Sequence, residues 1–236
     1  MKKLAVITGA GKGIGKALAE CFAKEGLSLA LCSRTKADLQ GLQTSLTRKH
    51  PDIEVFIRPT DVSQKREVIA FAQMIQGTGI PIEILVNNAG VFLPGQIHTE
   101  EEGALERQIE TNLYSAYHLT RALVPPMIDA KRGHIFNICS TASITAYTNG
   151  GSYCISKFAM LGMSKVLREE MKPYNIRVTS VLPGATLTNS WAGSDLPETR
   201  FMLPDDVAEV VLNAYHLSAR TVIEEILMRP QLGDIG

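Results

Sequence analysis

Residues 4–15 read LAVITGAGKGIG, and this stretch decides the fold. Its first five residues, Leu4–Thr8, are almost continuously apolar, which is typical of a strand buried on both faces. Glycines follow at positions 9, 13 and 15, directly before the helical spacing of apolar residues over Gly13–Glu25. Glycine lets such a turn tighten and lets a ligand approach the backbone. The stretch therefore predicts a strand, a phosphate-binding turn and a helix.

Strand-like and helical segments alternate along the rest of the chain. The predicted strands are Leu4–Thr8, Ser28–Cys32, Ile53–Ile57, Ile82–Val86, Gly133–Ile138, Arg177–Val181 and Thr221–Ile226. The predicted helices are Gly13–Glu25, Lys36–Lys49, Ser63–Ile75, about Thr99–Met127, Gly151–Met171 and Pro204–Ala214. Repeated strand–helix–strand units imply parallel pairing with right-handed crossovers. We therefore expect one α/β domain over residues 1–236, a doubly wound (Rossmann) parallel sheet of about seven strands with helices on both faces.

One segment follows neither period. Residues 185–203 carry Gly193, Pro197 and several polar side chains without regular spacing. Irregular segments of this length inside a compact domain are usually lids or disordered. We interpret this one as a short lid over a substrate.

Composition excludes several classes of partner. Lys plus Arg equals Asp plus Glu at 24 each, so no global charge attracts nucleic acid or an anionic membrane. No apolar run approaches the roughly 20 residues that cross a bilayer. The four cysteines (Cys21, Cys32, Cys139 and Cys154) lack paired spacing, and we expect buried thiols in a reducing cytoplasm. No metal-ligand spacing occurs, so no metal is expected.

A second motif carries the chemistry. Tyr153 and Lys157 are four residues apart in a predicted helix, and Ser140 lies thirteen residues before the tyrosine. Positions i and i+4 project from one helix face, so the spacing sets an ammonium beside a phenol. A fixed positive charge favours the phenolate and activates such a tyrosine as an acid or base. With a pyrophosphate turn in the same chain, this points to nicotinamide redox chemistry.

The end of the second strand selects the cofactor. An NAD site of this type usually places a carboxylate there, to accept bonds from the ribose hydroxyls. This chain has Ser33 and Arg34 instead, with Lys12 in the glycine turn; Asp38, the nearest acid, falls inside the predicted helix. Two cations and a hydroxyl suit a 2′-phosphate. The sequence predicts NADP(H).

Further cofactor contacts are expected at the ends of strands three and four. Asp61 can accept from the adenine amino group or cap the next helix with Ser63, and both interpretations stay open. The run NNAG at residues 87–90 ends strand four, where ligands of open α/β sheets bind. The predicted cofactor residues in these segments are Gly9, Lys12, Gly13, Ile14, Gly15, Ser33, Arg34, Asp61, Val62, Asn88, Ala89 and Gly90.

These motifs together resemble one family. The patterns TGxxxGxG, NNAG, Asn112, Ser140, YxxxK and Pro183-Gly184 occur in the order of the short-chain dehydrogenase/reductase family, from Leu4 to at least Asp234. The closing segment SARTVIEEILMRPQLGDI and the lid sequence LTNSWAG look like its bacterial sepiapterin-reductase-like branch.

The resemblance implies roles for individual residues. Tyr153 would protonate a substrate oxygen, Ser140 would hydrogen-bond that oxygen, and Lys157 would hold the nicotinamide ribose. Asn112 would serve a water-mediated proton path behind Lys157. Tyr153 and Lys157 therefore also count as cofactor contacts, with Pro183, Gly184, Thr186 and Thr188 beside the nicotinamide end.

The expected function is NADPH-dependent reduction of a ketone or diketone, with a pterin side-chain ketone as one substrate. Trp191 either stacks on a planar substrate or caps the lid or an oligomer contact. Reduction of a 3-oxoacyl thioester or steroid-like ketone is the enzymatic alternative, although Arg200 is the only lid cation available for a phosphopantetheine carrier. A cofactor-binding regulator is the non-enzymatic one. A homodimer or homotetramer through Thr99–Met127 and Gly151–Met171 is expected.

Overall fold

Seven parallel strands form one sheet in the computed structural model, which describes residues 2–188, 191 and 193–235. The strand order is β3-β2-β1-β4-β5-β6-β7. The strands are β1 (Leu4–Thr8), β2 (Ser28–Ser33), β3 (Val55–Pro59), β4 (Ile82–Asn87), β5 (Gly133–Ile138), β6 (Ile176–Pro183) and β7 (Glu225–Met228). The predicted doubly wound parallel sheet is confirmed.

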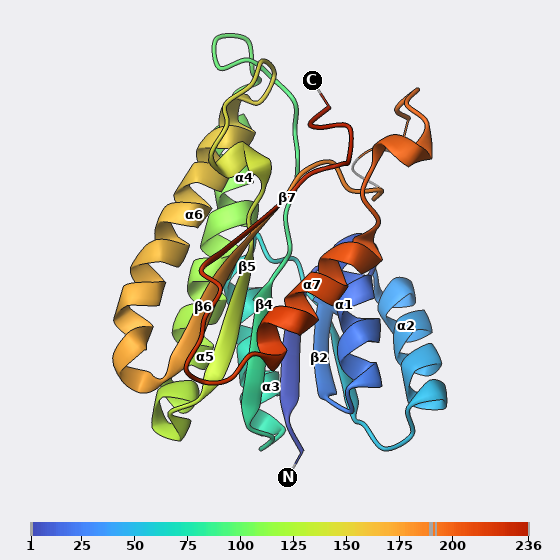
Figure 1. Cartoon of the computed structure of the whole chain (residues 1–236), viewed down its shortest axis with the longest axis vertical. Coiled ribbons are helices and arrows are strands. Elements are labelled where there is room, and N and C mark those ends of the chain that lie inside the picture. The colour runs from blue at the N-terminus through green and yellow to red at the C-terminus, as the bar shows by residue number, and fades with distance from the viewer. Residues whose placement is uncertain (1, 189–190, 192, 236) are drawn as a thin grey trace.

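Helices cover both faces of this sheet (Figure 1). One face carries α1 (Gly13–Lys24), α2 (Lys36–Lys49) and α7 (Pro204–His216). The other carries α3 (Lys65–Gly77), α5 (Ser115–Ala130) and α6 (Gly151–Met171). A short helix α4 (Ala104–Ile109) continues into α5 through a π-helical turn, Glu110–Tyr114. In the described part of the chain, no helix is long and apolar enough to span a bilayer.

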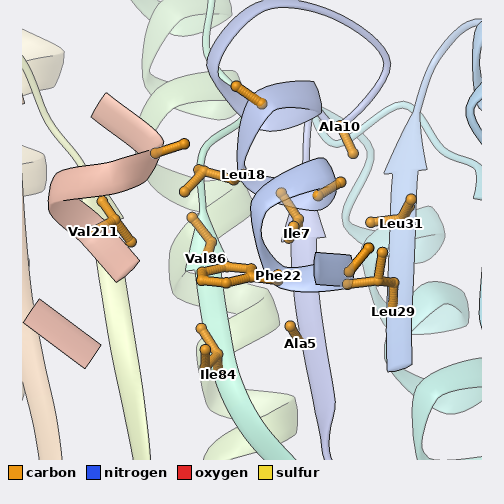
Figure 2. Packing of buried hydrophobic residues seen from close by; sticks show 14 of the residues in the cluster. Ala5, Ile7, Ala10, Leu18, Phe22, Leu29, Leu31, Ile84, Val86 and Val211 are labelled. Carbon is orange, nitrogen blue, oxygen red and sulfur yellow. The ribbon is translucent and has the colours of Figure 1, made fainter. Parts of the chain in front are cut away.

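The continuous apolar run of β1 is explained by two separate cores. Ala5 and Ile7 face the cluster formed with α1, α2 and α7, whereas Leu4 and Val6 face the cluster formed with α3, α5 and α6. Alternate residues of a strand point to opposite faces, so a strand between two helical layers needs apolar residues throughout. Figure 2 shows the first cluster, in which Phe22 of α1 lies over the sheet.

The strand order reverses between β1 and β4, and the carboxyl ends of these two strands are where a ligand crevice is expected. From β1 the chain crosses to β2 on one side, and from β4 it crosses to β5 on the other. Ligands of open α/β sheets bind at such a reversal. Residues 88–103, here called the β4–α4 loop, lie at this end of the sheet, as does the 185–203 segment (Figure 1).

Several predicted boundaries differ from the structure by a few residues. Strand β3 begins at Val55 rather than Ile53, and β7 spans Glu225–Met228 rather than Thr221–Ile226. The long predicted helix begins at Ala104 rather than Thr99 and extends to Ala130, with the π-helical turn inside it. Gly103 precedes it with φ of +80°, in the left-handed region that excludes a right-handed helical turn. The apolar spacing alone did not reveal this break.

His134 of β5 gives a prediction for stability. Its Nε2 lies 2.7 Å from Thr179 Oγ1, whose own hydroxyl donates to Ile223 O at 2.6 Å, so Nε2 carries the hydrogen. Burial, with a smaller contribution from the Arg177 charge, lowers the pKa of His134 from 6.5 to about 2. Below pH 6.5, His134 therefore becomes protonated in the unfolded chain but stays neutral in the native state. We expect this group to remove about 2 kcal/mol of the free energy of unfolding between about pH 7 and pH 5.

Denaturant unfolding at several pH values measures this loss. His134→Gln keeps a neutral N–H donor and should flatten the pH dependence by the amount that His134 contributes. An equally steep dependence in the variant would assign the acid sensitivity to other groups.

Candidate active site

Helix α6 holds Tyr153 and Lys157 side by side. The Lys157 Nζ atom lies 5.9 Å from the centre of the Tyr153 ring, as the four-residue spacing predicts. Nζ also donates to the backbone oxygen of Ile138, at the end of β5, at 2.9 Å. Lys157 is only 5% exposed, so its charge is held at a fixed place beside the phenol. An ammonium has three donors, so two remain for a ligand.

Ser140 follows β5 and opens a short 3-10 turn, Thr141–Ser143. Its Oγ accepts from the Ala142 N–H at 3.1 Å, while its own N–H donates to Ser143 Oγ at 3.2 Å. These reciprocal bonds fix the Ser140 side chain, and the turn packs against α6. Because Oγ acts as an acceptor in this bond, its hydroxyl hydrogen is left for a different acceptor.

Asn112 lies in the π-helical turn and grips the β4–α4 loop. Its Oδ1 accepts from Val91 N–H at 2.7 Å, and its Nδ2 donates to Val91 O and to Ser156 Oγ, both at 2.9 Å. Ser156 Oγ in turn donates to the Tyr153 backbone oxygen at 2.8 Å. Asn112 is thus tied to the start of α6. The water-mediated role that the family resemblance implies remains a prediction.

Gln108, one helical turn before Asn112, binds the β4–α4 loop in a similar way. Its side-chain amide binds the N–H of Leu93 at 3.2 Å and the C=O of Leu93 at 3.3 Å, and it is fully buried. Phe92, between the two clamped residues, meets the Tyr153 ring edge-on with centroids 4.9 Å apart. Sequence reasoning missed both residues. The only local signal was the four-residue spacing of Gln108 and Asn112 on one helix face.

The glycine turn and the NNAG run form one rigid floor. Asn88 Nδ2 donates to Thr8 O at 2.8 Å, and Thr8 Oγ1 accepts from the N–H groups of Asn88 and Ala89 at 3.0 Å each. A Cβ on Gly15 would lie 2.4 Å from Gly9 O, and Gly9 itself has φ of +66°. Only glycine fits these two positions, so the turn packs closely against itself and against Asn88.

The remaining NNAG residues connect this floor to the catalytic helix. A Cβ on Gly90 would lie 3.3 Å from Asn112 Oδ1 and 3.6 Å from Lys157 Nζ, so Gly90 borders both predicted site residues. Asn87 Nδ2 donates to Asn137 Oδ1 at 2.9 Å and to Thr120 Oγ1 at 3.0 Å. Asn87 therefore ties the end of β4 to β5 and to α5.

The structure places the Asp38 carboxylate beside Lys12, one of the residues predicted to bind the 2′-phosphate. Lys12 Nζ lies 3.4 Å from Asp38 Oδ2, and a Cβ on Gly11 would lie 2.9 Å from Ser33 Oγ. The sequence analysis set Asp38 aside because it falls within a helix, but the first turn of α2 lies over the end of β2. Lys12 is 58% exposed, and exposed ion pairs contribute little. The pair leaves Lys12 free to reorient, and the Arg34 side chain is exposed beside it.

Asp61 is engaged within its own turn. Its Oδ1 accepts from the Ser63 N–H at 3.1 Å and from the Ser63 hydroxyl at 2.8 Å, while the N-cap of α3 is Gln64. This geometry favours the structural interpretation over an adenine contact. Val62 and Ile14 are partly buried against the two core clusters.

The described part of the 185–203 segment, predicted to be a lid, is bonded to the sheet end at its base, and Thr188 lies against the glycine turn. Thr186 pairs with Met202, and Leu187 N–H donates to Met202 O at 2.8 Å. Gly184, after Pro183 at the end of β6, donates its N–H to Met228 O at 2.8 Å. A Cβ on Gly13, whose φ is +54°, would lie 3.0 Å from Thr188 Cγ2. The 185–203 segment is irregular in its described residues apart from a 3-10 turn at Glu198–Arg200.

Two further aromatic residues have contacts that bear on the predicted site. Trp191 packs on Phe201 within the lid, with ring centroids 5.1 Å apart, so it has an internal partner. Tyr147, which the sequence analysis missed, lies in the segment before α6 and is 44% exposed. Burial raises the pKa of Tyr147, and the Tyr153 phenol nearby raises it further.

Fold and site together define a class. A glycine turn at the sheet's reversal point, and an ammonium fixed beside a phenol, belong to dinucleotide-dependent oxidoreductases. The short chain dehydrogenase family matches residues 3–198. The chain belongs to this family, as the motif order predicted.

Individual relatives agree over the whole length. A sepiapterin reductase of Chlorobaculum tepidum is 36% identical over 243 aligned residues, covering 100% of this chain and 99% of the relative. An alcohol dehydrogenase of the archaeon Thermococcus sibiricus, solved with 5-hydroxy-NADP, superposes with a TM-score of 0.92 at 26% identity, with 100% of both chains covered. A metagenomic short-chain oxidoreductase solved with NADP has a TM-score of 0.84 at 32% identity, with 97% of both chains covered.

Proposed function

We propose that this protein is an NADP(H)-dependent carbonyl reductase that acts on ketones or diketones, including a pterin side-chain ketone. The observation that carries the proposal is the buried Lys157 ammonium fixed beside the Tyr153 phenol, at the end of the sheet that carries the glycine turn. Residues 1–236 act as one domain, with the 185–203 segment as the lid over the substrate.

The glycine turn fits the pyrophosphate of a dinucleotide. The turn leads directly into the N-terminus of α1, whose N-cap residue Lys12 makes no side-chain capping hydrogen bond, and an anion is stabilised at such a helix end. NADPH, when bound, supplies the hydride. The two relatives solved with NADP or its 5-hydroxy derivative support this choice of cofactor.

The protein's own groups handle the substrate oxygen and its proton. Tyr153 donates its phenolic proton to the oxygen as negative charge develops there. The Ser140 hydroxyl, held from behind by the Ala142 N–H, donates a hydrogen bond to the same oxygen. Lys157 stabilises the resulting phenolate and offers its two remaining N–H groups to the ribose hydroxyls.

The substrate class rests on the lid and on the sepiapterin reductase relative. Trp191 and Phe201 pack together in the 185–203 segment, and such an aromatic pair would suit a flat heteroaromatic ketone. The Trp191 contact with substrate belongs to this proposal. Reduction of 3-oxoacyl thioesters or steroid-like ketones is the second enzymatic candidate.

A substrate panel tests the function. Sepiapterin-type pterins, small diketones and 3-oxoacyl esters would be compared by the loss of NADPH absorbance. Highest kcat/KM for a pterin or diketone supports the proposal, and highest kcat/KM for the acyl esters would replace it with the second candidate. Binding of NADPH without turnover on any carbonyl would favour a regulator.

Arg34→Ala tests the cofactor preference. Hydrogen bonds to charged groups contribute about 1.5–3 kcal/mol, so the KM for NADPH should rise roughly ten- to hundredfold. The KM for NADH, which lacks the 2′-phosphate, should stay near its wild-type value. Lys36→Ala, which removes an exposed cation two residues away, is the matched control. Equal changes for both cofactors, or a wild-type preference for NADH, would contradict the NADP(H) assignment.

Assembly as a homodimer or homotetramer is part of the proposal. Met160 and Leu161 of α6 are buried within the protomer and are not available for an interface between copies. Phe158, Ile155 and Val166 of α6 remain 40–58% exposed, beside Leu105 of α4 at 39%. A monomer mass by light scattering would contradict the assembly.

Free cysteines at all four positions are in keeping with a cytoplasmic location.

A further inference from the structure

The catalytic helix α6 begins without a cap of its own. Its N-cap residue is Gly150, which has no side chain, and the helix opens with Gly151 and Ser152 before Tyr153. The first N–H groups of any helix lack partners inside the helix and need an acceptor from elsewhere. Serine, threonine, aspartate or asparagine at the N-cap usually provides one. In this chain another segment must provide it.

Glu100 of the β4–α4 loop supplies the missing acceptor. Its Oε1 accepts from the Ser152 N–H at 2.8 Å, and its Oε2 accepts a short hydrogen bond from the Ser152 hydroxyl. The Glu100 side chain lies between Gly95 and Gly151: a Cβ on Gly95 would lie 2.5 Å from Glu100 Cγ, and a Cβ on Gly151 would collide with Glu100 Oε1. A negative charge at a helix N-terminus is also favoured by the helix dipole. The place is thus shaped for this one side chain.

The loop that carries Glu100 is itself fastened to the start of α6. Gly95 forms a bridge with Gly150, and its N–H donates to Asn149 O at 3.0 Å. Gln96 Nε2 donates to Asn149 Oδ1 at 3.1 Å, and Gln96 O accepts from the Glu100 N–H at 2.8 Å. These bonds hold the β4–α4 loop, and with it Glu100, against the start of α6.

The same loop contacts the catalytic tyrosine twice. Glu100 holds the residue directly before Tyr153, and Phe92 packs edge-on against the Tyr153 ring. We propose that Glu100 is a positioning residue: by capping α6 from the β4–α4 loop it sets the place of the Tyr153 phenol relative to Ser140 and the substrate oxygen. This inference rests on the proposed function, because it assigns Tyr153 the proton transfer. Neither the motifs nor the family resemblance assign a role to Glu100.

Glu100→Ala, compared with Glu101→Ala, tests the inference. Glu101 is the adjacent carboxylate, its side chain is 90% exposed, and its ion pair with Arg107 is 3.7 Å long. Because small displacements of a reacting group cost up to about 10²-fold in rate, Glu100→Ala should lower kcat by roughly ten- to hundredfold. The dissociation constant of NADPH should be unchanged. The deuterium isotope effect on kcat, with the transferred hydrogen labelled, should rise because the chemical step becomes limiting.

Two additional measurements separate positioning from a general loss of structure. Hydrogen exchange across residues 150–157 of the free protein should accelerate in Glu100→Ala and not in Glu101→Ala. Glu100→Gln keeps an acceptor for the Ser152 N–H and a partner for its hydroxyl, so it should restore most of kcat. A wild-type kcat in Glu100→Ala, or a lower kcat with an unchanged isotope effect, would overturn the inference.

The inference can still be tested if the Glu100→Ala variant is unfolded. If Glu100→Ala does not fold, Glu100→Asp carries the test, because it keeps the charge and shortens the reach by one methylene; a wild-type kcat in Glu100→Asp would overturn the inference. Tyr153→Phe is assayed in parallel. Normal turnover in Tyr153→Phe would reject the proposed function itself, whereas an inactive Tyr153→Phe beside a fully active Glu100→Ala would reject only the role of Glu100.

Discussion

Tyr153→Phe is expected to lower kcat for carbonyl reduction by about 10²–10⁴-fold, the usual contribution of a general acid. The substitution removes only the phenolic oxygen, and the ring keeps its edge-on contact with Phe92. NADPH affinity should fall little, because Tyr153 is only one of many proposed cofactor contacts. Stopped assays at high enzyme concentration would quantify the residual rate, and NADPH fluorescence titration would give the affinity.

Tyr174→Phe is the matched control for this variant. Tyr174 lies in the 3-10 turn after α6 and is 37% exposed, so the loss of its hydroxyl should leave kcat unchanged. Near-normal turnover in Tyr153→Phe would remove the phenol from the mechanism. Equal losses in both variants would point to a general effect on the fold.

Lys157→Met is expected to lower both kcat and NADPH affinity. Methionine has a similar length but provides neither the charge beside the Tyr153 ring nor the donors for a ribose. Losing hydrogen bonds from a charged group costs about 1.5–3 kcal/mol, which corresponds to a roughly ten- to hundredfold higher dissociation constant for NADPH. The Ile138 carbonyl also loses its 2.9 Å donor, so the melting temperature should fall.

Lys165→Met separates this effect from a change in helix charge. Lys165 lies on the same helix with its side chain 60% exposed, and pairs with Glu225 at 2.9 Å. Its replacement should leave kcat and NADPH affinity near their wild-type values, since exposed pairs contribute little. Wild-type NADPH affinity in Lys157→Met would show that Lys157 does not hold the ribose.

Sequence alone predicted the features that arise from short-range patterns. The sheet followed from apolar runs such as Leu4–Thr8, because a strand between two helical layers must be apolar on both faces. The Tyr153–Lys157 pair followed from helix geometry, which fixes side chains four residues apart. Both depend on neighbours within one element, so they are visible before the fold is known.

Contacts between distant segments were not predictable in this way. Glu100 reaches the N–H and the hydroxyl of Ser152 across 52 residues, and no short-range pattern links two positions so far apart. Asp38 was placed correctly in a helix, yet its contact with Lys12 depends on how α2 lies over β2. The glycines at 150 and 151 were the one usable hint, because a helix that starts without a capping side chain implies a cap from another segment.

The grip of Asn112 and Gln108 on the β4–α4 loop has an evolutionary consequence. Both amides hold peptide groups of Val91 and Leu93, which every residue type except proline presents in the same way. Side chains in this segment can therefore drift over generations while the path of the chain is kept. Homologous proteins can therefore change their substrate specificity through this segment without losing the fold. A library of random substitutions at Phe92 should contain a high proportion of folded variants.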